Sequence, residues 1–133
     1  MTATNATEPM THERAQTFAR RWAEEWNRRD VEAVLAHFAD EVEFTSPRAA
    51  ATVGTATVHG KDALRAYWNA AMARIETIHF TIDHAVWDPA SAALLIVYTS
   101  SINGQTNRAG ELLQLNAAGL AVRGEAFHGA MLT

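Results

Sequence analysis

Apolar residues in the first half of the chain recur three and four residues apart, the spacing of one face of a helix. One stripe spans residues 11–28, a second follows Asp30, which is suited to cap a helix, and a third follows Gly60. We therefore expect three helices. Their apolar stripes consist of Ala15, Phe18, Ala19, Trp22 and Trp26, then Val31, Val34, Leu35 and Phe38, then Leu64, Tyr67, Trp68, Ala71, Met72 and Ile75.

The pattern between and after these helices is that of strands. Residues 42–45 predict a short strand that ends before Pro47, and residues 48–59, rich in Ala, Thr and Gly, predict a long irregular loop. The second half predicts an antiparallel meander with turn-forming residues between its strands. The expected strands are 79–87, 93–102, 108–115 and 120–128. Helices followed by a meander predict an α+β fold, with the helices on one face of the sheet.

Glu111 lies on the apolar face of the expected strand 108–115. Side chains alternate between the two faces of a strand, and Ala109, Leu113 and Leu115 share the parity of Glu111. A carboxylate that faces a core is costly unless it is paired, protonated or lines a pocket. Glu111 is therefore a candidate for proton chemistry. The alternatives are a wrongly assigned face or a buried ion pair.

The last hairpin sets the neighbours of Glu111. With a four-residue loop at 116–119, Glu111 opposes Gly124, and His128 lies on the same face, roughly 13 Å away at ~3.3 Å per residue. That separation is too long for a hydrogen bond but suits two groups on either side of a small ligand. A register changed by one residue would place Glu111 beside Arg123, and a structural salt bridge would then explain it.

Tyr98 and the helical aromatic residues are further candidates for a pocket. Tyr98 shares its strand face with apolar residues, where a tyrosine either presents its phenol to a pocket or is structural. Aromatic stripes on helices are usually plain core. The large rings here, opposite the small residues Ser100, Gly124 and Ala126, add support to the alternative of a cavity. The six histidines are scattered without a metal-binding spacing, so we expect no metal site.

Composition narrows the class of protein. The 133 residues suit one domain over 11–133, and the polar residues 1–10 are expected to form a flexible arm without a signal sequence. A net charge of −4 argues against nucleic acid or a membrane as partner. The absence of cysteine fits a cytoplasmic location, and the longest apolar run is too short to cross a bilayer.

Four local motifs resemble the nuclear transport factor 2-like superfamily, in its SnoaL-like and ketosteroid-isomerase-like branch. They are WNRRDVEA (26–33), FADEVEFTSP (38–47), VHGKDALRAYW (58–68) and GLAVR (119–123), and the resemblance covers about residues 14–129. It implies a cone-shaped fold of three N-terminal helices packed on a strongly curved mixed, largely antiparallel sheet that encloses a pocket. It also implies a homodimer through the outer sheet face. The family hosts both enzymes and binding proteins, so the fold alone does not define the function.

The resemblance also suggests roles for individual residues. Glu111 falls where ketosteroid isomerases carry an acid that stays protonated and donates a hydrogen bond to an oxyanion. Their general-base aspartate corresponds to Ser46 and their oxyanion tyrosine to Trp22, which puts steroid isomerisation by that mechanism in doubt. His128 falls at a pocket-lining position near the mouth.

The leading hypothesis is cofactor-independent acid–base catalysis on a small apolar or polyketide-like carbonyl compound. Glu111 would be the central acid, with His128 and Tyr98 assisting. Two alternatives are a non-catalytic domain that binds a small apolar molecule, and a dimerisation module whose interior is filled and whose Glu111 pairs with Arg123 or Arg108. The residues expected to line the pocket are Trp22, Trp26, Phe44, Ser46, Tyr67, Trp68, Met72, Ile96, Ser100, Leu113, Gly124 and Ala126.

Overall fold

The computed structural model describes residues 9–132, and residues 1–8 and 133 are outside that description. Most of the arm expected at residues 1–10 therefore lies outside the described residues. Met10, at its end, packs against the core. No helix within residues 9–132 is long and apolar enough to cross a membrane.

The three expected helices are present. α1 (His12–Asn27) begins at Thr11, whose hydroxyl accepts a hydrogen bond from the backbone N–H of Arg14 at 3.1 Å. α2 (Val31–Leu35) begins at Asp30, which caps it as predicted, and Phe38 already belongs to the following strand. α4 (Lys61–Arg74) buries Leu64, Tyr67, Trp68 and Ala71 on one face.

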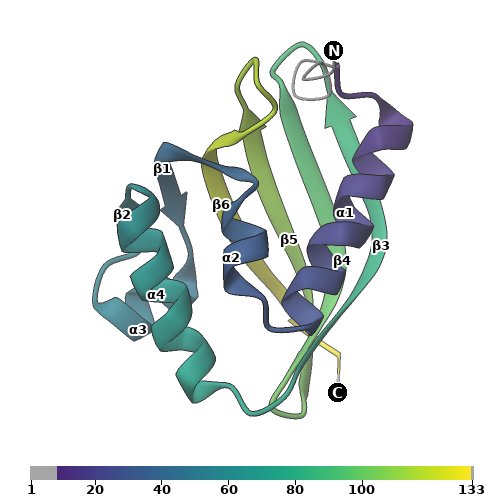
Figure 1. Cartoon of the computed structure of the whole chain (residues 1–133). Coiled ribbons are helices and arrows are strands. Elements are labelled where there is room, and N and C mark those ends of the chain that lie inside the picture. Colours follow the sequence, from purple (N-terminus) through teal and green to yellow (C-terminus); the bar gives the residue numbers. More distant parts are fainter. Residues whose placement is uncertain (1–8, 133) are drawn as a thin grey trace.

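The strands of the described residues form a single mixed sheet of six strands in the order β2-β1-β6-β5-β4-β3. β1 (Phe38–Thr45) runs parallel to β6 (Ala121–Met131), and all other neighbours are antiparallel. The remaining strands are β2 (Thr57–His59), β3 (Ile78–Asp88), β4 (Ala93–Ile102) and β5 (Gln105–Leu115). Figure 1 shows the sheet curving without closing on itself, with the helices on its concave side. The predicted α+β class and the mixed, curved sheet are confirmed.

The prediction of an irregular loop at 48–59 is wrong. This stretch contains α3 (Pro47–Val53) and the strand β2, which extends the sheet beside β1. Ser46 caps α3, Pro47 occupies its first turn, and Gly54 ends it with a left-handed backbone at φ 85°. A fourth short helix therefore stands beside α4 at the open side of the sheet (Figure 1).

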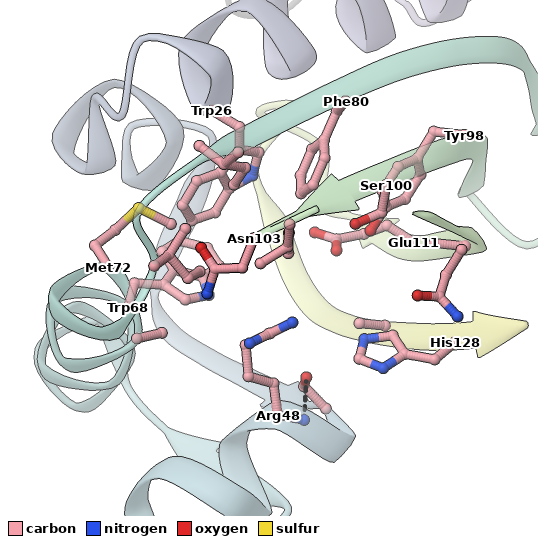
Figure 2. A pocket seen from close by; sticks show the side chains of 18 of the residues that line it. Trp26, Arg48, Trp68, Met72, Phe80, Tyr98, Ser100, Asn103, Glu111 and His128 are labelled. Atoms are coloured by element: carbon pink, nitrogen blue, oxygen red, sulfur yellow. Dashed lines mark hydrogen bonds between the residues drawn. The ribbon is translucent and has the colours of Figure 1, made fainter. Parts of the chain in front are cut away.

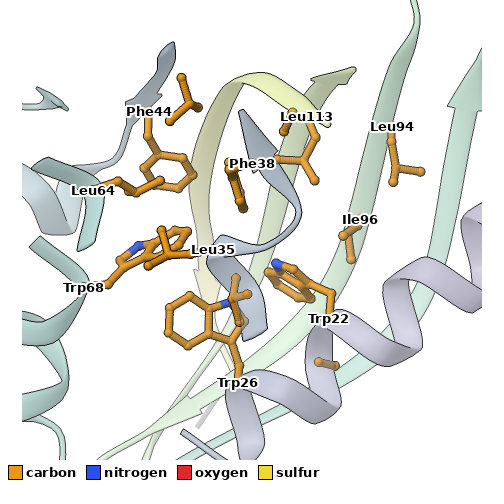
Figure 3. Packing of buried hydrophobic residues seen from close by; sticks show 14 of the residues in the cluster. Trp22, Trp26, Leu35, Phe38, Phe44, Leu64, Trp68, Leu94, Ile96 and Leu113 are labelled. Carbon is orange, nitrogen blue, oxygen red and sulfur yellow. The ribbon is translucent and has the colours of Figure 1, made fainter. Parts of the chain in front are cut away.

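The core lies between α1, α2, α4 and the concave face of the sheet. Aromatic side chains dominate it, and Trp68 lies edge-on to Trp26, Phe38 and Phe44 with ring centroids 5.0–5.4 Å apart. Figure 3 shows these rings from α1 and α4 meeting Phe38, Phe44 and Leu113 from the sheet. The aromatic stripes predicted for the helices thus belong to the core, and some of the same rings also face a cavity.

The register of the last hairpin differs from the expected one by two residues. Glu111 opposes Ala126, Gly124 opposes Leu113, and His128 opposes Ala109. An irregularity between Gln114 and Leu115 shifts the pairing near the turn. Because the shift is even, Glu111, Ala126 and His128 still share the concave face, as predicted.

Candidate functional site

A cavity of about 390 Å³ opens on the concave side of the sheet, between α1, α3, α4 and the strands β3–β6. Its volume lies within the range of small-molecule sites. Figure 2 shows aromatic rings on one side of it and polar groups around Arg48 and His128 on the other. Its lining includes Trp22, Trp26, Phe44, Ser46, Arg48, Tyr67, Trp68, Met72, Phe80, Tyr98, Ser100, Asn103, Asn107, Glu111, Ala126 and His128.

Nine of the twelve expected pocket residues and all three expected catalytic residues line this cavity. The other three pocket residues, Ile96, Leu113 and Gly124, are buried but do not line the cavity. Gly124 does not leave open space above Glu111. A Cβ there would come within 2.7 Å of the Phe44 ring, so the glycine permits close packing of Phe44 against β6.

Glu111 extends from β5 into the cavity and is only 4% exposed. Burial raises its pKa to about 8, because the charged form loses its hydration, and the Trp22 indole opposes this rise slightly. The salt bridges expected by the third hypothesis are not formed. Arg108 pairs with Asp83, and Arg123, at an outward-facing position of β6, is exposed. At neutral pH Glu111 is therefore a neutral carboxylic acid that can donate a hydrogen bond.

Trp22 supplies a second donor to the same region. Its indole Nε1 and Glu111 Oε2 are both buried, and neither has a hydrogen-bond partner within residues 9–132. Although the indole lies close enough to influence the carboxyl pKa, the two groups do not satisfy each other in good hydrogen-bond geometry. Buried polar atoms in folded proteins nearly always have a partner, so two such atoms beside one cavity indicate a place for a ligand or water.

Tyr98 lies on β4, two residues along from the position opposite Glu111. Its ring packs against Trp22 and Phe80 at centroid distances of 5.0 and 4.8 Å. Burial, and next the nearby Glu111 carboxyl, raise the pKa of the phenol well above its usual range. Tyr98 therefore stays protonated and acts only as a hydrogen-bonding group or as part of the wall.

His128 lies closer to Glu111 than the sequence predicted. It opposes Ala109, which is two residues from Glu111, so the two side chains are diagonal neighbours about 7–8 Å apart rather than 13 Å. Although His128 is an exposed residue, partial desolvation of its imidazole and, next, the charge of the Arg48 guanidinium lower the pKa of the ring. His128 is therefore neutral at neutral pH and can accept a proton at the mouth of the cavity.

Arg48 is the site residue that the sequence did not reveal. It stands in the first turn of α3, where its backbone N–H donates to Ser46 Oγ at 3.1 Å. From there it reaches into the open side of the cavity, below Glu111 and beside His128 in Figure 2. The sequence signals for α3 are the Ser46-Pro47 cap and the late Gly54, which the Ala-, Thr- and Gly-rich composition of this stretch obscures.

Ser46 occupies the position at which the resemblance would place a general base. Its hydroxyl caps α3 and lies 3.2 Å from the hydroxyl of Tyr67, both of them buried. Burial raises the pKa of Tyr67. This pair is a neutral hydrogen-bonded support for the cavity wall and offers no base. Within residues 9–132 no group of three or more His, Asp or Glu side chains is arranged to hold a metal ion.

Comparisons with known proteins agree with this architecture. A SnoaL-like protein of unknown function from Burkholderia thailandensis is 28% identical, with 92% of this chain and 100% of that chain covered, and a TM-score of 0.79. An NTF2-like protein of unknown function from Burkholderia pseudomallei is 23% identical, with 90% and 92% covered, and a TM-score of 0.72. A putative ketosteroid isomerase from Kribbella flavida is 16% identical, with 90% and 80% covered, and a TM-score of 0.66.

The last two similarities show the fold alone, because their sequence identities are low. No curated protein matches the sequence significantly. The family model of the SnoaL-like domain matches residues 19–124, which include the second half of α1, all of α2 and α4, and Glu111. The chain therefore belongs to the SnoaL-like family.

Proposed function

We propose that this protein is a cofactor-independent enzyme that moves a proton on a small carbonyl compound, by way of an enol or enolate. The family includes isomerases and cyclases, whose reactions start from such species. One observation carries the proposal. Glu111 Oε2 and Trp22 Nε1 are buried, unpartnered within the described chain, and beside one cavity.

Glu111 supplies the acid half of the reaction. As a neutral acid in an apolar site it donates a hydrogen bond to the carbonyl oxygen of the substrate, with the Trp22 N–H as a second donor. Both bonds strengthen as negative charge develops on that oxygen, so they stabilise the enolate more than the ketone. Burial of these donors matters because a hydrogen bond is worth more where water is excluded.

His128 supplies the base half. Its neutral imidazole accepts a proton from the carbon next to the carbonyl and becomes imidazolium, while the C–H electrons form the enolate. Return of this proton to another carbon completes an isomerisation, and attack of the enolate carbon on a second carbonyl completes a cyclisation. The spacing of about 7–8 Å between His128 and Glu111 leaves room for a substrate carbonyl and its α-carbon between them.

A binding protein with the same cavity is the second candidate. It is favoured by Ser46, which stands where related enzymes carry a base and instead caps α3. In that case Glu111 and Trp22 hold a ligand oxygen without any reaction. A filled dimerisation module is not supported, since the interior is open and Glu111 has no salt bridge.

Exchange of deuterium into acetophenone in D₂O tests the proposal, since the acetyl methyl group exchanges only through the enol. Proton NMR should show accelerated loss of the methyl signal with the natural protein. Glu111→Gln and His128→Gln should each slow it by about a hundredfold. Glu125→Gln, an exposed outer-face change, is the matched control.

The two candidate functions give different results in this assay. Thermal stabilisation by acetophenone without any exchange would support the binding protein and refute the enzyme. Exchange that is undiminished in Glu111→Gln would remove Glu111 from the mechanism.

A further inference from the structure

Arg48 carries an unbalanced charge in the cavity. Several other arginines of the described chain meet carboxylates, as Arg65 does with Glu32 at 2.7 Å and Arg108 with Asp83. For the half-buried Arg48 guanidinium there is neither a salt bridge nor a side-chain hydrogen bond to any residue of 9–132. A partly desolvated guanidinium without an anion is costly, and its five donors are left for a ligand.

The place of Arg48 is fixed by the backbone of α3. Its N–H is held by Ser46 Oγ, and Ser46 is itself buried against Tyr67. Figure 2 shows the side chain extending into the middle of the open side, with His128 on the neighbouring strand. Its charge adds to burial in lowering the pKa of His128, and it opposes the rise that burial causes in the pKa of Tyr67 and Tyr98.

The cavity as a whole is positive. Among residues 9–132, Glu111 is the only acidic one in the lining, and its pKa of about 8 keeps it neutral at neutral pH. His128 is neutral as well, because its pKa is lowered. One positive charge, that of Arg48, therefore remains inside a chain whose net charge is −4. A single charge suits a carboxylate better than a phosphate dianion.

The opposite wall is apolar and aromatic. Trp22, Trp26, Trp68 and Phe80 line it. Glu111, only 4% exposed, is buried more deeply in the cavity than the half-buried Arg48. A volume of about 390 Å³ lies toward the lower end of the range of small-molecule pockets. The space therefore suits a compact ring or short chain that has a polar group at each end.

We propose that the cavity binds a small aryl or alicyclic carboxylic acid. Its carboxylate pairs with Arg48 at the opening, its apolar body lies against the tryptophans, and a carbonyl oxygen at its far end meets Glu111. This inference names the substrate class of the proposed enzyme and so rests on that function. It also applies to the binding protein, since recognition of the two ends needs no reaction.

Calorimetric binding of two matched probes tests the inference. 4-Acetylbenzoate carries the carboxylate and the distal carbonyl, and 4-acetylbenzamide is its neutral analogue of the same length. We expect the natural protein to bind the acid about tenfold or more tightly than the amide. Arg48→Gln should abolish this preference and leave amide binding within about twofold, while Arg48→Lys should keep part of it.

Arg20→Gln, an exposed change on α1 far from the lining, is the control and should leave the preference intact. Thermal unfolding of each variant verifies that it is folded. Equal binding of both probes, no binding of the acid, or a preference that survives Arg48→Gln would overturn the inference. Deuterium exchange into acetophenone without an acid preference refutes this inference alone, whereas an acid preference without exchange into the acetyl methyl group of 4-acetylbenzoate refutes the enzymatic function alone.

Discussion

Trp22 Nε1 and Glu111 Oε2 are buried polar atoms from α1 and β5, and neither has a hydrogen-bond partner in the described chain. Both side chains line one cavity. The structure keeps a proton on the carboxyl, as the pKa of about 8 indicates, rather than pairing it with a cation. A neutral acid and an indole N–H that line one cavity are suited to hold an oxygen atom of a ligand.

The protonation of Glu111 makes stability depend on pH. Its folded pKa of about 8 exceeds the ordinary value of 4.5, so the folded state binds more protons than the unfolded state between these pH values. The free energy of unfolding therefore falls as pH rises through this range. Glu111→Gln removes that dependence. The free energy of unfolding of this variant, relative to that of the natural protein, should therefore increase by up to about 1.4 kcal/mol for each pH unit.

Urea unfolding at mildly acidic, neutral and mildly alkaline pH measures this difference. The two proteins should be similarly stable below pH 4.5, and their difference should level off above about pH 8. Glu125→Gln, on the exposed outer face, should follow the natural protein throughout. Parallel curves for Glu111→Gln and the natural protein would mean that Glu111 is charged in the folded state.

Gly124 is required by the packing of Phe44. An added Cβ would lie 2.7 Å from Phe44 Cδ1 and 3.2 Å from Leu113 Cδ2, and the ring is held by Phe38 and Trp68. Gly124→Ala should therefore lower the free energy of unfolding by about 1–3 kcal/mol in urea titrations.

Gly110→Ala is the matched control on the neighbouring strand. Its added Cβ meets nothing closer than 3.7 Å, so it should be neutral or stabilise by about 0.4–1 kcal/mol. Equal destabilisation by both changes would contradict the close contact at Gly124.

Ser46 joins the cap of α3 to the cavity wall. Ser46→Ala removes the cap and leaves the buried Tyr67 hydroxyl without its partner, at a cost of about 1–3 kcal/mol. Thr11→Ala removes only the exposed cap of α1 and should cost about 1 kcal/mol. A double-mutant cycle with Tyr67→Phe should show coupling of at least about 0.5 kcal/mol, and strict additivity would exclude the hydrogen bond.

The expected homodimer remains a prediction, and the outer sheet face offers a surface for it. Leu112 is 37% exposed and Phe127 is 45% exposed, on adjacent outward-facing positions of β5 and β6. Leu112→Lys with Phe127→Lys should convert a dimer to a monomer in sedimentation velocity, because charges are excluded from apolar interface cores. Val53→Lys, at an equally exposed apolar residue of α3, is the control and should leave the sedimenting mass of the dimer unchanged. A natural protein that sediments as a monomer would refute the prediction.

Much of the fold could be predicted from the sequence because local signals agree with it. The helical stripes, the cap at Asp30 and the turn at Asn103-Gly104 each mark an element that the structure contains. The orientation of Glu111 toward the concave face could be predicted from the alternation of side chains along its strand. This alternation has a period of two, so an error of two residues in the register leaves the predicted face unchanged. Tyr98 and His128 were placed on the same face by the same argument.

The remainder depended on tertiary contacts that a sequence pattern does not encode. Leu115 pairs with Ala121 rather than Leu120, and the irregularity beside it adds a second residue of shift to β6. Together they bring His128 nearer to Glu111 and place Gly124 opposite Leu113. Ile96 and Leu113 share the concave face with Glu111, but other side chains cover them. Arg48 was missed because α3 is short and its apolar residues form no stripe.

The most direct test of the account is the titration of the Glu111 side chain itself. Carbon-13 NMR of protein labelled at the glutamate carboxyl follows each group with pH, and Glu111→Gln assigns the signal. The account predicts a titration of Glu111 near pH 8, and a shift of its carboxyl signal when acetophenone binds. A titration close to the ordinary value of 4.5, or a carboxyl signal that acetophenone leaves unchanged, would contradict it.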